Sequence, residues 1–161
     1  MNVYLVPASS ENIKATVTKG VSIDVAKRCL NQYDFDRLSS QLGDKKIFYC
    51  WAMTEGKRST FQSMGIGDSV IITLAGTGLF NYVAEVICKA ESIDLGKTLW
   101  TYVPNNPWKL IYFLTEIRTI NVRKPTLLQA LGYDPADHVS GVRRVLTERL
   151  HVIKKYSSIH E

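Results

Sequence analysis

The chain has 161 residues, of which 45% are hydrophobic and 22% are charged, and its formal net charge is +5. A chain of this size can bury roughly two-thirds of its unfolded surface, so we expect residues 1–161 to form a single domain that needs no metal or disulfide framework. No run approaches the roughly 18 apolar residues of a membrane span. The chain begins with an apolar strand and not with a basic leader, so we expect no signal peptide and a cytoplasmic location.

The N-terminal half of the sequence predicts two strands with two helices between them. In chain order they are a strand over 3–6, a helix over 13–18, a helix over 25–30 and an aromatic-rich strand over 46–53. Ser9 or Ser10 can cap the first helix and Asp24 the second, because a side-chain oxygen at that position accepts hydrogen bonds from free backbone amides. Each strand is a short run rich in β-branched or aromatic residues.

The C-terminal half predicts a hairpin, one more strand and two helices. In chain order they are strands over 69–75, 80–88 and 108–117 and helices over 126–130 and 141–152. Residues 76–78, Gly-Thr-Gly, suit the hairpin turn, Pro125 suits the start of a helix, and residues 142–150 have nearly helical spacing. This order favours an α+β fold with a mixed or antiparallel sheet, curled into a small barrel with helices outside.

No sequence pattern indicates catalysis. Residues 96–98, Gly-Lys-Thr, are similar to the end of a phosphate-binding loop, but Glu91 occupies the position of the required glycine and would repel phosphate. The histidines lack metal-ligand spacing. Cys29, Cys50 and Cys88 lack C-x-x-C spacing and suit reduced core thiols. We therefore expect no catalytic residue, no metal and no cofactor in this domain.

Basic and aromatic residues are the remaining functional signals. The basic residues expected to contact nucleic-acid phosphates are Arg118, Arg123, Lys124, Arg143 and Arg144. Trp51, Trp100 and Trp108 could form a pocket that stacks on a base, which contributes roughly 1–3 kcal/mol per base. The alternative readings are a solvated helix face for the cations and core packing for the tryptophans.

Several segments resemble EVE and YTH domains. Residues 4–21 (Tyr-Leu-Val-Pro-Ala-Ser-Ser-Glu-Asn-Ile through Thr-Lys-Gly-Val) resemble the opening of YTH domains. Gly67 and Asp68 resemble the Gly-Asp strand start of EVE domains, and residues 78–86 resemble a strand that both families share. Trp100 and the strand over 108–117 are similar to their late tryptophan and the strand after it. The resemblance implies a PUA-like mixed β-barrel that reads modified bases.

Carried onto this sequence, the resemblance implies an aromatic cage with a polar floor. Trp51 and Trp100 would be its walls, and Asn12 would bind the base edge, because an amide offers both a donor and an acceptor. The Ala52 backbone would line the floor, and Ser9 belongs to the same base-binding set.

One segment departs from the YTH pattern. The first YTH tryptophan directly follows Gly-Val, whereas Ser22 follows here and Trp51 comes after an insertion of helical character over 22–46. The insertion either delivers Trp51 to the same place or blocks the pocket. Together with the basic C-terminal helix, it resembles the N-terminal domains of McrB-type modification-dependent restriction proteins, in which such a module is fused to a GTP-hydrolysing motor that recruits a nuclease.

The expected function is therefore that of a DNA reader. We expect it to flip out a methylated base, with N6-methyladenine favoured over methylated cytosine, as the N-terminal targeting module of a larger restriction GTPase. Three alternatives stay open at this point: a reader of modified RNA, a metal-independent ribonuclease of the ASCH type, and a protein-interaction module with an occluded pocket.

Overall fold

The computed structural model describes residues 1–101 and 107–157, which form a sheet flanked by helices. The strands are β1 (Val3–Ala8), β2 (Val21–Ser22), β3 (Ile47–Met53), β4 (Ser69–Leu74), β5 (Leu79–Glu91), β6 (Leu110–Leu114), β7 (Arg118–Arg123) and β8 (Arg143–Arg144). The α-helices are α1 (Ser10–Thr16), α2 (Ile23–Cys29), α3 (Gln32–Leu42), α4 (Arg58–Ser63), α5 (Ile93–Leu99), α6 (Lys124–Ala130) and α7 (Leu150–Ser157). Two short 3-10 helices are η1 (Glu55–Lys57) and η2 (Thr147–Arg149).

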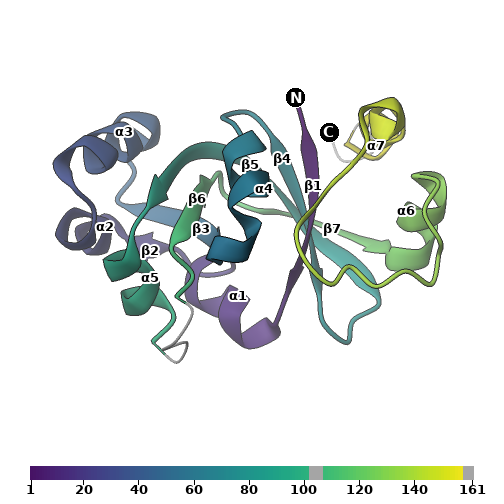
Figure 1. The fold of residues 1–161 in the computed structure, drawn as a ribbon, viewed down its shortest axis with the longest axis horizontal. Coiled ribbons are helices and arrows are strands. Elements are labelled where there is room, and N and C mark those ends of the chain that lie inside the picture. Colours follow the sequence, from purple (N-terminus) through teal and green to yellow (C-terminus); the bar gives the residue numbers. More distant parts are fainter. Residues whose placement is uncertain (102–106, 158–161) are drawn as a thin grey trace.

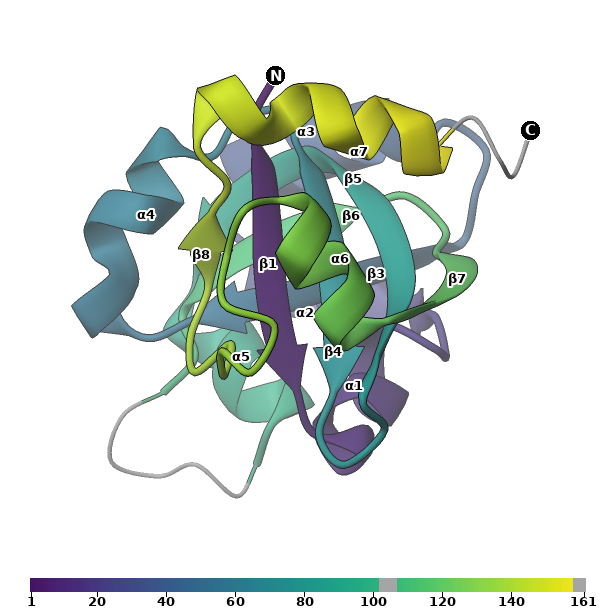
Figure 2. The same ribbon diagram turned by 90° about the vertical axis from the view of Figure 1, so that its right-hand side faces the viewer.

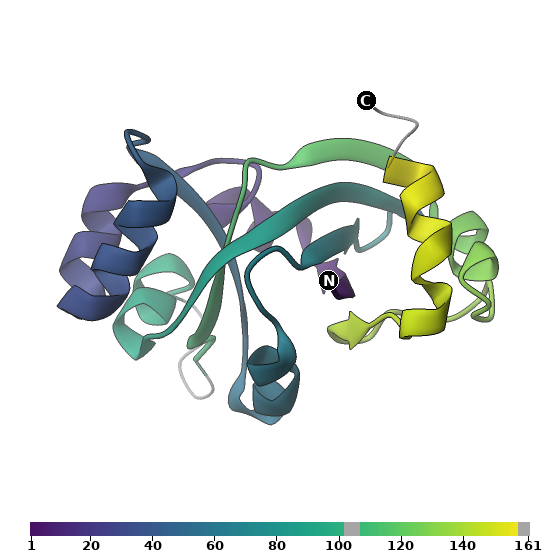
Figure 3. The same cartoon turned by 90° about the horizontal axis from the view of Figure 1, so that it is seen from above.

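The sheet has the strand order β2-β3-β6-β5-β4-β1-β8, and β7 pairs with β5 beside this path. β1 runs parallel to β4, and the other pairs are antiparallel. The 13-residue strand β5 connects the two parts of the sheet. Its first half pairs with β4 and β7 on opposite edges, and its second half, from Val86, pairs with β6. The strand curves along its length (Figure 3), and the sheet curls with it.

Helices cover the sheet on two sides (Figure 1). Helices α2, α3 and α5 lie on one side, and α6 and α7 lie on the other. Seen from the second side, α6 and α7 lie in front of β1, β4 and β5 (Figure 2). None of the helices in the described part of the chain is both long and apolar enough to cross a membrane. The predicted α+β class, a mixed curled sheet with helices outside, is confirmed.

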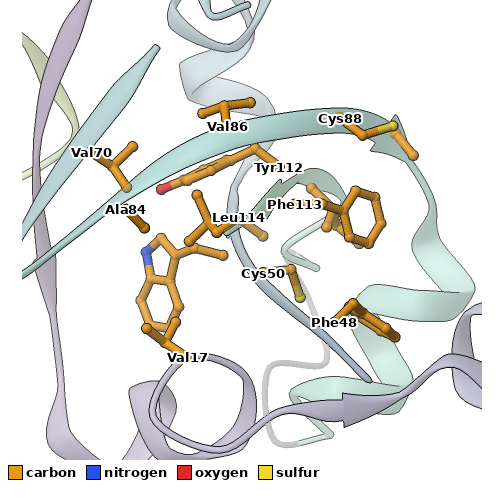
Figure 4. Close-up of a cluster of buried hydrophobic side chains, with 14 of the residues drawn as sticks. Val17, Phe48, Cys50, Val70, Ala84, Val86, Cys88, Tyr112, Phe113 and Leu114 are labelled. Carbon is orange, nitrogen blue, oxygen red and sulfur yellow. The ribbon is translucent and has the colours of Figure 1, made fainter. Parts of the chain in front are cut away.

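Two hydrophobic cores lie on the two faces of β1. Tyr4 and Val6 point into the larger core, whereas Val3 and Leu5 point into the smaller core beneath α6 and α7. Successive side chains of a strand point to opposite faces, so burial on both sides explains the uninterrupted apolar run. Figure 4 shows side chains of the larger core, among them Tyr112, whose hydroxyl pKa is raised by complete burial.

The predicted C-terminal helix over 141–152 is wrong before residue 147, and η2 over Thr147–Arg149 precedes the α-helix. Arg143 and Arg144 form the extended strand β8, which pairs with Leu5 and Tyr4 of β1, and α7 begins only at Leu150. The Val145 amide donates to the Val3 carbonyl at 2.8 Å. The open edge of β1 offers hydrogen bonds that an isolated helix could not, and Gly141 is a poor helix residue. Arg143 and Arg144 therefore do not lie on a basic helix.

Other differences from the sequence prediction are local. The second helix begins two residues earlier than expected, because Ser22 caps it by accepting from the Asp24 amide, and Asp24 lies inside the helix. Ser9 is the cap of α1, with its Oγ 3.2 Å from the Asn12 amide. β7 was not predicted. The helical character of residues 22–46 is confirmed by α2 and α3.

Candidate nucleic-acid interface

A cavity of about 480 Å³ opens where β1 ends, next to α1 and the turn between β4 and β5. This volume is within the range of roughly 300–1,000 Å³ that is typical of small-ligand sites. We call it the tryptophan cavity. Its lining residues are Pro7, Ala8, Ser9, Asn12, Trp51, Thr73, Leu74, Ala75, Gly76, Gly78, Trp108, Lys124, His138 and Val139. Of the described residues that line it, none is a carboxylate, and Lys124 and His138 are the ionisable ones.

Three tryptophans pack against one another at one side of this cavity. The ring centroids of Trp51 and Trp108 are 5.6 Å apart, and those of Trp100 and Trp108 are 5.3 Å apart. Trp108 is half-buried and Trp51 is 4% exposed, and both line the cavity, whereas Trp100 is 1% exposed and lies outside the lining, 5.9 Å from Trp51. Aromatic pairs at these separations are favourable, so the two lining indoles are held in place by the third.

A glycine on α5 allows this arrangement. A Cβ added to Gly96 would overlap the carbonyl oxygen of Trp108 and would lie 3.0 Å from its carbonyl carbon. Only glycine lets the helix and the Trp108 backbone approach so closely. The Gly-Lys-Thr segment, rejected as a phosphate loop, thus has a packing role in the structure, because it places Trp100 against Trp108.

The polar groups of the cavity come from four segments, which are α1 with its cap, β4, the start of α6 and the loop that follows α6. The Ser9 side chain serves as the α1 cap, and the Thr73 hydroxyl donates to the Leu79 carbonyl at 2.7 Å. The Asn12 side chain is half-buried and makes no hydrogen bond to a described residue, so its amide can pair with a ligand. Lys124 and His138 add hydrogen-bond donors at the mouth.

The loop between α6 and β8, which we call the fastened loop, brings His138 and Val139 to the cavity. Asp137 accepts from Arg143 at 2.6 Å, and the Arg143 guanidinium lies 5.3 Å from the Tyr133 ring centroid. Arg149 lies 4.4 Å from the same ring. Arg143 holds the pKa of the Asp137 carboxyl below its usual value. Val139 is buried in the smaller core, so the loop is anchored on both sides of His138.

A charged network lies behind the Trp108 wall. Arg58 Nη2 contacts both Glu55 and Glu91 at 2.7 Å, and Lys109 Nζ lies 3.3 Å from Glu55. The pKa of Glu55 is lowered to about 2, chiefly by its hydrogen bond with Arg58. Because Lys109 follows Trp108 directly, the network ties that wall to η1, α4 and the end of β5.

Of the base-binding residues predicted from the sequence, three line the cavity and two do not. Trp51, Asn12 and Ser9 line it. Trp100 and Ala52, both in the described part of the chain, are buried outside it. Ala52 follows Trp51 on β3 and therefore points to the other face of the strand. Trp108 takes the place that the sequence analysis gave to Trp100.

The predicted phosphate contacts are spread over the molecule. Lys124 lines the cavity, and Arg123 precedes it in the chain. Arg118 is at the other end of β7 and lines a second cavity. Arg143 is paired with Asp137, and Arg144 is exposed on β8. No sequence pattern groups His138 with Lys124, because only the folded loop brings them to the same cavity.

The second cavity, which we call the α7 cavity, has a volume of about 520 Å³ and lies between α7 and the sheet. Its lining residues are Met1, Val3, Ser69, Ile71, Val83, Glu85, Arg118, Leu150, His151 and Ile153. Among the described residues around it there is no aromatic ring other than the His151 imidazole. Elsewhere within residues 1–101 and 107–157, no group of three or more His, Cys, Asp or Glu side chains could hold a metal ion.

Comparison with known proteins places the fold. No model of a protein family matches the sequence, and no curated protein sequence matches it. The N-terminal domain of Thermococcus gammatolerans McrB, solved bound to m5C DNA, matches with a TM-score of 0.76 and 15% identity over 100% of both chains. The YTH domain of Zygosaccharomyces rouxii MRB1, solved with N6-methyladenosine RNA, matches with a TM-score of 0.52 and 15% identity over 96% of this chain and 84% of that one.

Human THYN1, solved with 5-methylcytosine-containing DNA, matches with a TM-score of 0.50 and 11% identity over 100% of this chain and 99% of that one. At these identities the likeness is one of fold. The chain has an EVE/YTH-like fold and is similar in fold to the McrB N-terminal domain, as the sequence motifs predict.

Proposed function

We propose that this chain is a reader of modified DNA that holds a flipped-out methylated base in the tryptophan cavity. The observation that carries the proposal is a cavity with Trp51 and Trp108 on one side, Asn12 on α1, Lys124 at the mouth and no carboxylate among its described lining residues. Indole faces stack on a base, a free amide pairs with its edge, and a cation at the mouth attracts the phosphates.

The cost of flipping a base and the gain from binding it in the cavity are of similar size. Taking a base out of the duplex costs a few kcal/mol. Stacking on aromatic side chains contributes roughly 1–3 kcal/mol per base, and hydrogen bonds to the base edge must supply the rest. A methyl group adds apolar surface that is buried against the indoles, so the methylated base is preferred over the unmodified one.

The fold comparison supports DNA as the polymer. Of the three structures compared above, the one with the highest TM-score, 0.76, contains m5C DNA, THYN1 also contains DNA with a methylated cytosine, and the YTH domain contains N6-methyladenosine RNA. N6-methyladenine, favoured by the Glu-Asn turn in the sequence, and 5-methylcytosine are therefore the two candidate marks. The YTH likeness makes a reader of modified RNA the second candidate function.

By the same likeness, we propose that the domain is the targeting module of a restriction system. It would bring a GTPase motor to modified DNA, and the motor would recruit a nuclease. Other parts of the assembly would carry the motor and the nuclease. The domain itself would perform no catalysis. Its own task would end with binding the marked base.

The test is a titration of one sequence as unmodified DNA, N6-methyladenine DNA, 5-methylcytosine DNA and the matching N6-methyladenosine RNA. Each titration is run at about 50 and 200 mM salt, because phosphate contacts make binding strongly salt-dependent. Tighter, salt-sensitive binding to one modified DNA supports the proposal and names the mark. Preference for the RNA supports the second candidate, and equal binding to all four contradicts both.

A further inference from the structure

The cations around the tryptophan cavity fall into two groups. Arg58, Lys109 and Arg143 have carboxylate partners within 4 Å. Lys57 and Lys124 have no carboxylate partner among the described residues, and Arg123, the exposed neighbour of Lys124, has none either. Paired cations are largely neutralised, so the unpaired ones dominate the attraction for phosphate.

Lys57 is close to the loop that forms one wall of the cavity. A Cβ added to Gly141 would lie 3.1 Å from both Cε and Nζ of Lys57, so the ammonium lies directly against this residue. Gly141 follows His138 and Val139, which line the cavity, by three and two positions. Lys57 also ends η1, shortly after β3, which carries Trp51. Nothing in the sequence connected Lys57 with the site.

Arg123 and Lys124 lie on the opposite side. The Lys124 amide donates to the Gly78 carbonyl at 2.9 Å, which fixes the residue beside the turn between β4 and β5. Figure 2 shows α4, which directly follows Lys57, and α6, which begins at Lys124, on opposite sides of β1. Lys124 lines the cavity where β1 ends, and so do His138 and Val139 of the loop that Lys57 touches at Gly141.

We propose that the strand carrying the flipped nucleotide crosses the cavity mouth between these two cationic sides. One phosphate lies on Lys57, and the phosphate on the other side of the flipped nucleotide lies on Arg123 and Lys124. A nucleotide that enters a pocket leaves its two flanking phosphates outside, so a cation on each side of the mouth holds the strand across it. This inference rests on the proposed function and adds Lys57 to the interface.

The test compares Lys57→Gln with Lys27→Gln in the full 161-residue chain. Lys27 is exposed on α2, on the other side of the sheet from α6, so its removal changes the net charge equally without touching the cavity. The measured quantity is the magnitude of the slope of log affinity against log salt for the preferred modified duplex, which we call the slope. Losing one phosphate contact lowers this slope by about 0.9.

We expect Lys57→Gln to lower the slope by about 0.9 and to weaken binding several-fold at low salt, and Lys27→Gln to change the slope little. The double variant Lys57→Gln/Lys124→Gln should lower it by about twice as much, since the two residues hold different phosphates. In Lys57→Gln the ratio of affinities for modified and unmodified duplex should not change, because a phosphate contact does not read the base.

Equal slopes for Lys57→Gln and Lys27→Gln overturn the inference, even if the wild-type chain prefers modified DNA. Loss of that preference in Lys57→Gln also overturns it, because Lys57 would then act on the base or on the fold. If the wild-type chain shows no preference among the duplexes, the reader function fails, while a lower slope for Lys57→Gln still supports the two-sided contact.

Discussion

The tryptophan cavity and the α7 cavity have similar volumes, about 480 and 520 Å³, and very different linings. The first offers two indoles, a free amide and cations without a described carboxylate. The second offers aliphatic side chains with Glu85, which would repel phosphate, next to Arg118. The difference teaches that size does not identify a base-binding site in this fold. We assign the proposed base-binding site to the tryptophan cavity because it combines a stacking surface with positive charge that no described lining carboxylate opposes.

The largest expected effect on DNA binding is that of removing the Trp108 side chain from the tryptophan cavity. We expect Trp108→Ala to weaken binding to modified DNA about ten- to hundredfold, because one stacking surface is lost. Tyr33→Ala removes an aromatic side chain that is 71% exposed on α3 and should bind like wild type. Trp108→Phe, which keeps a ring in place, should retain part of the affinity. Equal binding by the alanine and wild-type chains would move the site elsewhere.

Gly96→Ala tests the packing behind that wall. Replacing a helical glycine with alanine normally stabilises a helix by roughly 0.5–1 kcal/mol. Here the methyl group would overlap the Trp108 carbonyl, so we expect destabilisation of roughly 1–3 kcal/mol and weaker binding of modified DNA. Gly56→Ala is the matched control, since its Cβ meets no atom within 4 Å. Thermal unfolding of both variants checks the sign, and a more stable Gly96→Ala chain would refute the close contact.

The charges at the two cavities can be compared directly. Lys124→Gln should reduce the magnitude of the slope of log affinity against log salt by about 0.9, because one phosphate contact is lost. Arg118→Gln removes the same charge at the α7 cavity, and we expect its slope to remain close to that of the wild type. A larger effect for Arg118→Gln would place the nucleic acid along β7 and away from the tryptophan cavity.

The smallest effect is the pH dependence of the fastened loop. Arg143 lowers the pKa of Asp137 in the folded chain, so the pair contributes stability above the unfolded pKa of about 4 and loses it as the pH falls through the lower folded value. Asp137→Asn should therefore melt slightly below wild type at pH 7, and the two melting temperatures should converge at strongly acidic pH. A constant difference at all pH values would mean that the ion pair does not contribute.

Much of the fold could be predicted from local pattern. The apolar strands, the Gly-Thr-Gly turn and the helix opened by Pro125 all appear near their predicted positions. β8 was missed because Val142 and Val145 fit a helix as well as a strand, and only the free edge of β1 decides between them. A partner 140 residues away in the chain leaves no local signal.

The candidate site was predicted in part, for a related reason. Trp51 and Asn12 could be named, but spacing could not show which of Trp100 and Trp108 faces the cavity. That choice depends on the close approach of α5 at Gly96, a contact in three dimensions. In the same way, the sequence could not distinguish the paired Arg143 from the unpaired Lys124, because the distance to a carboxylate is not visible in it.

The pairing of β1 with β8 also affects how the chain reaches this fold. Tyr4 pairs with Arg144, so the N-terminal strand completes its hydrogen bonds only when the last third of the chain is available. Closing such long loops costs entropy before any contact compensates for it, which makes folding slow. During synthesis β1 leaves the ribosome before β8, so its edge stays unpaired until β8 has been made. An unpaired strand edge is prone to aggregation until its partner arrives.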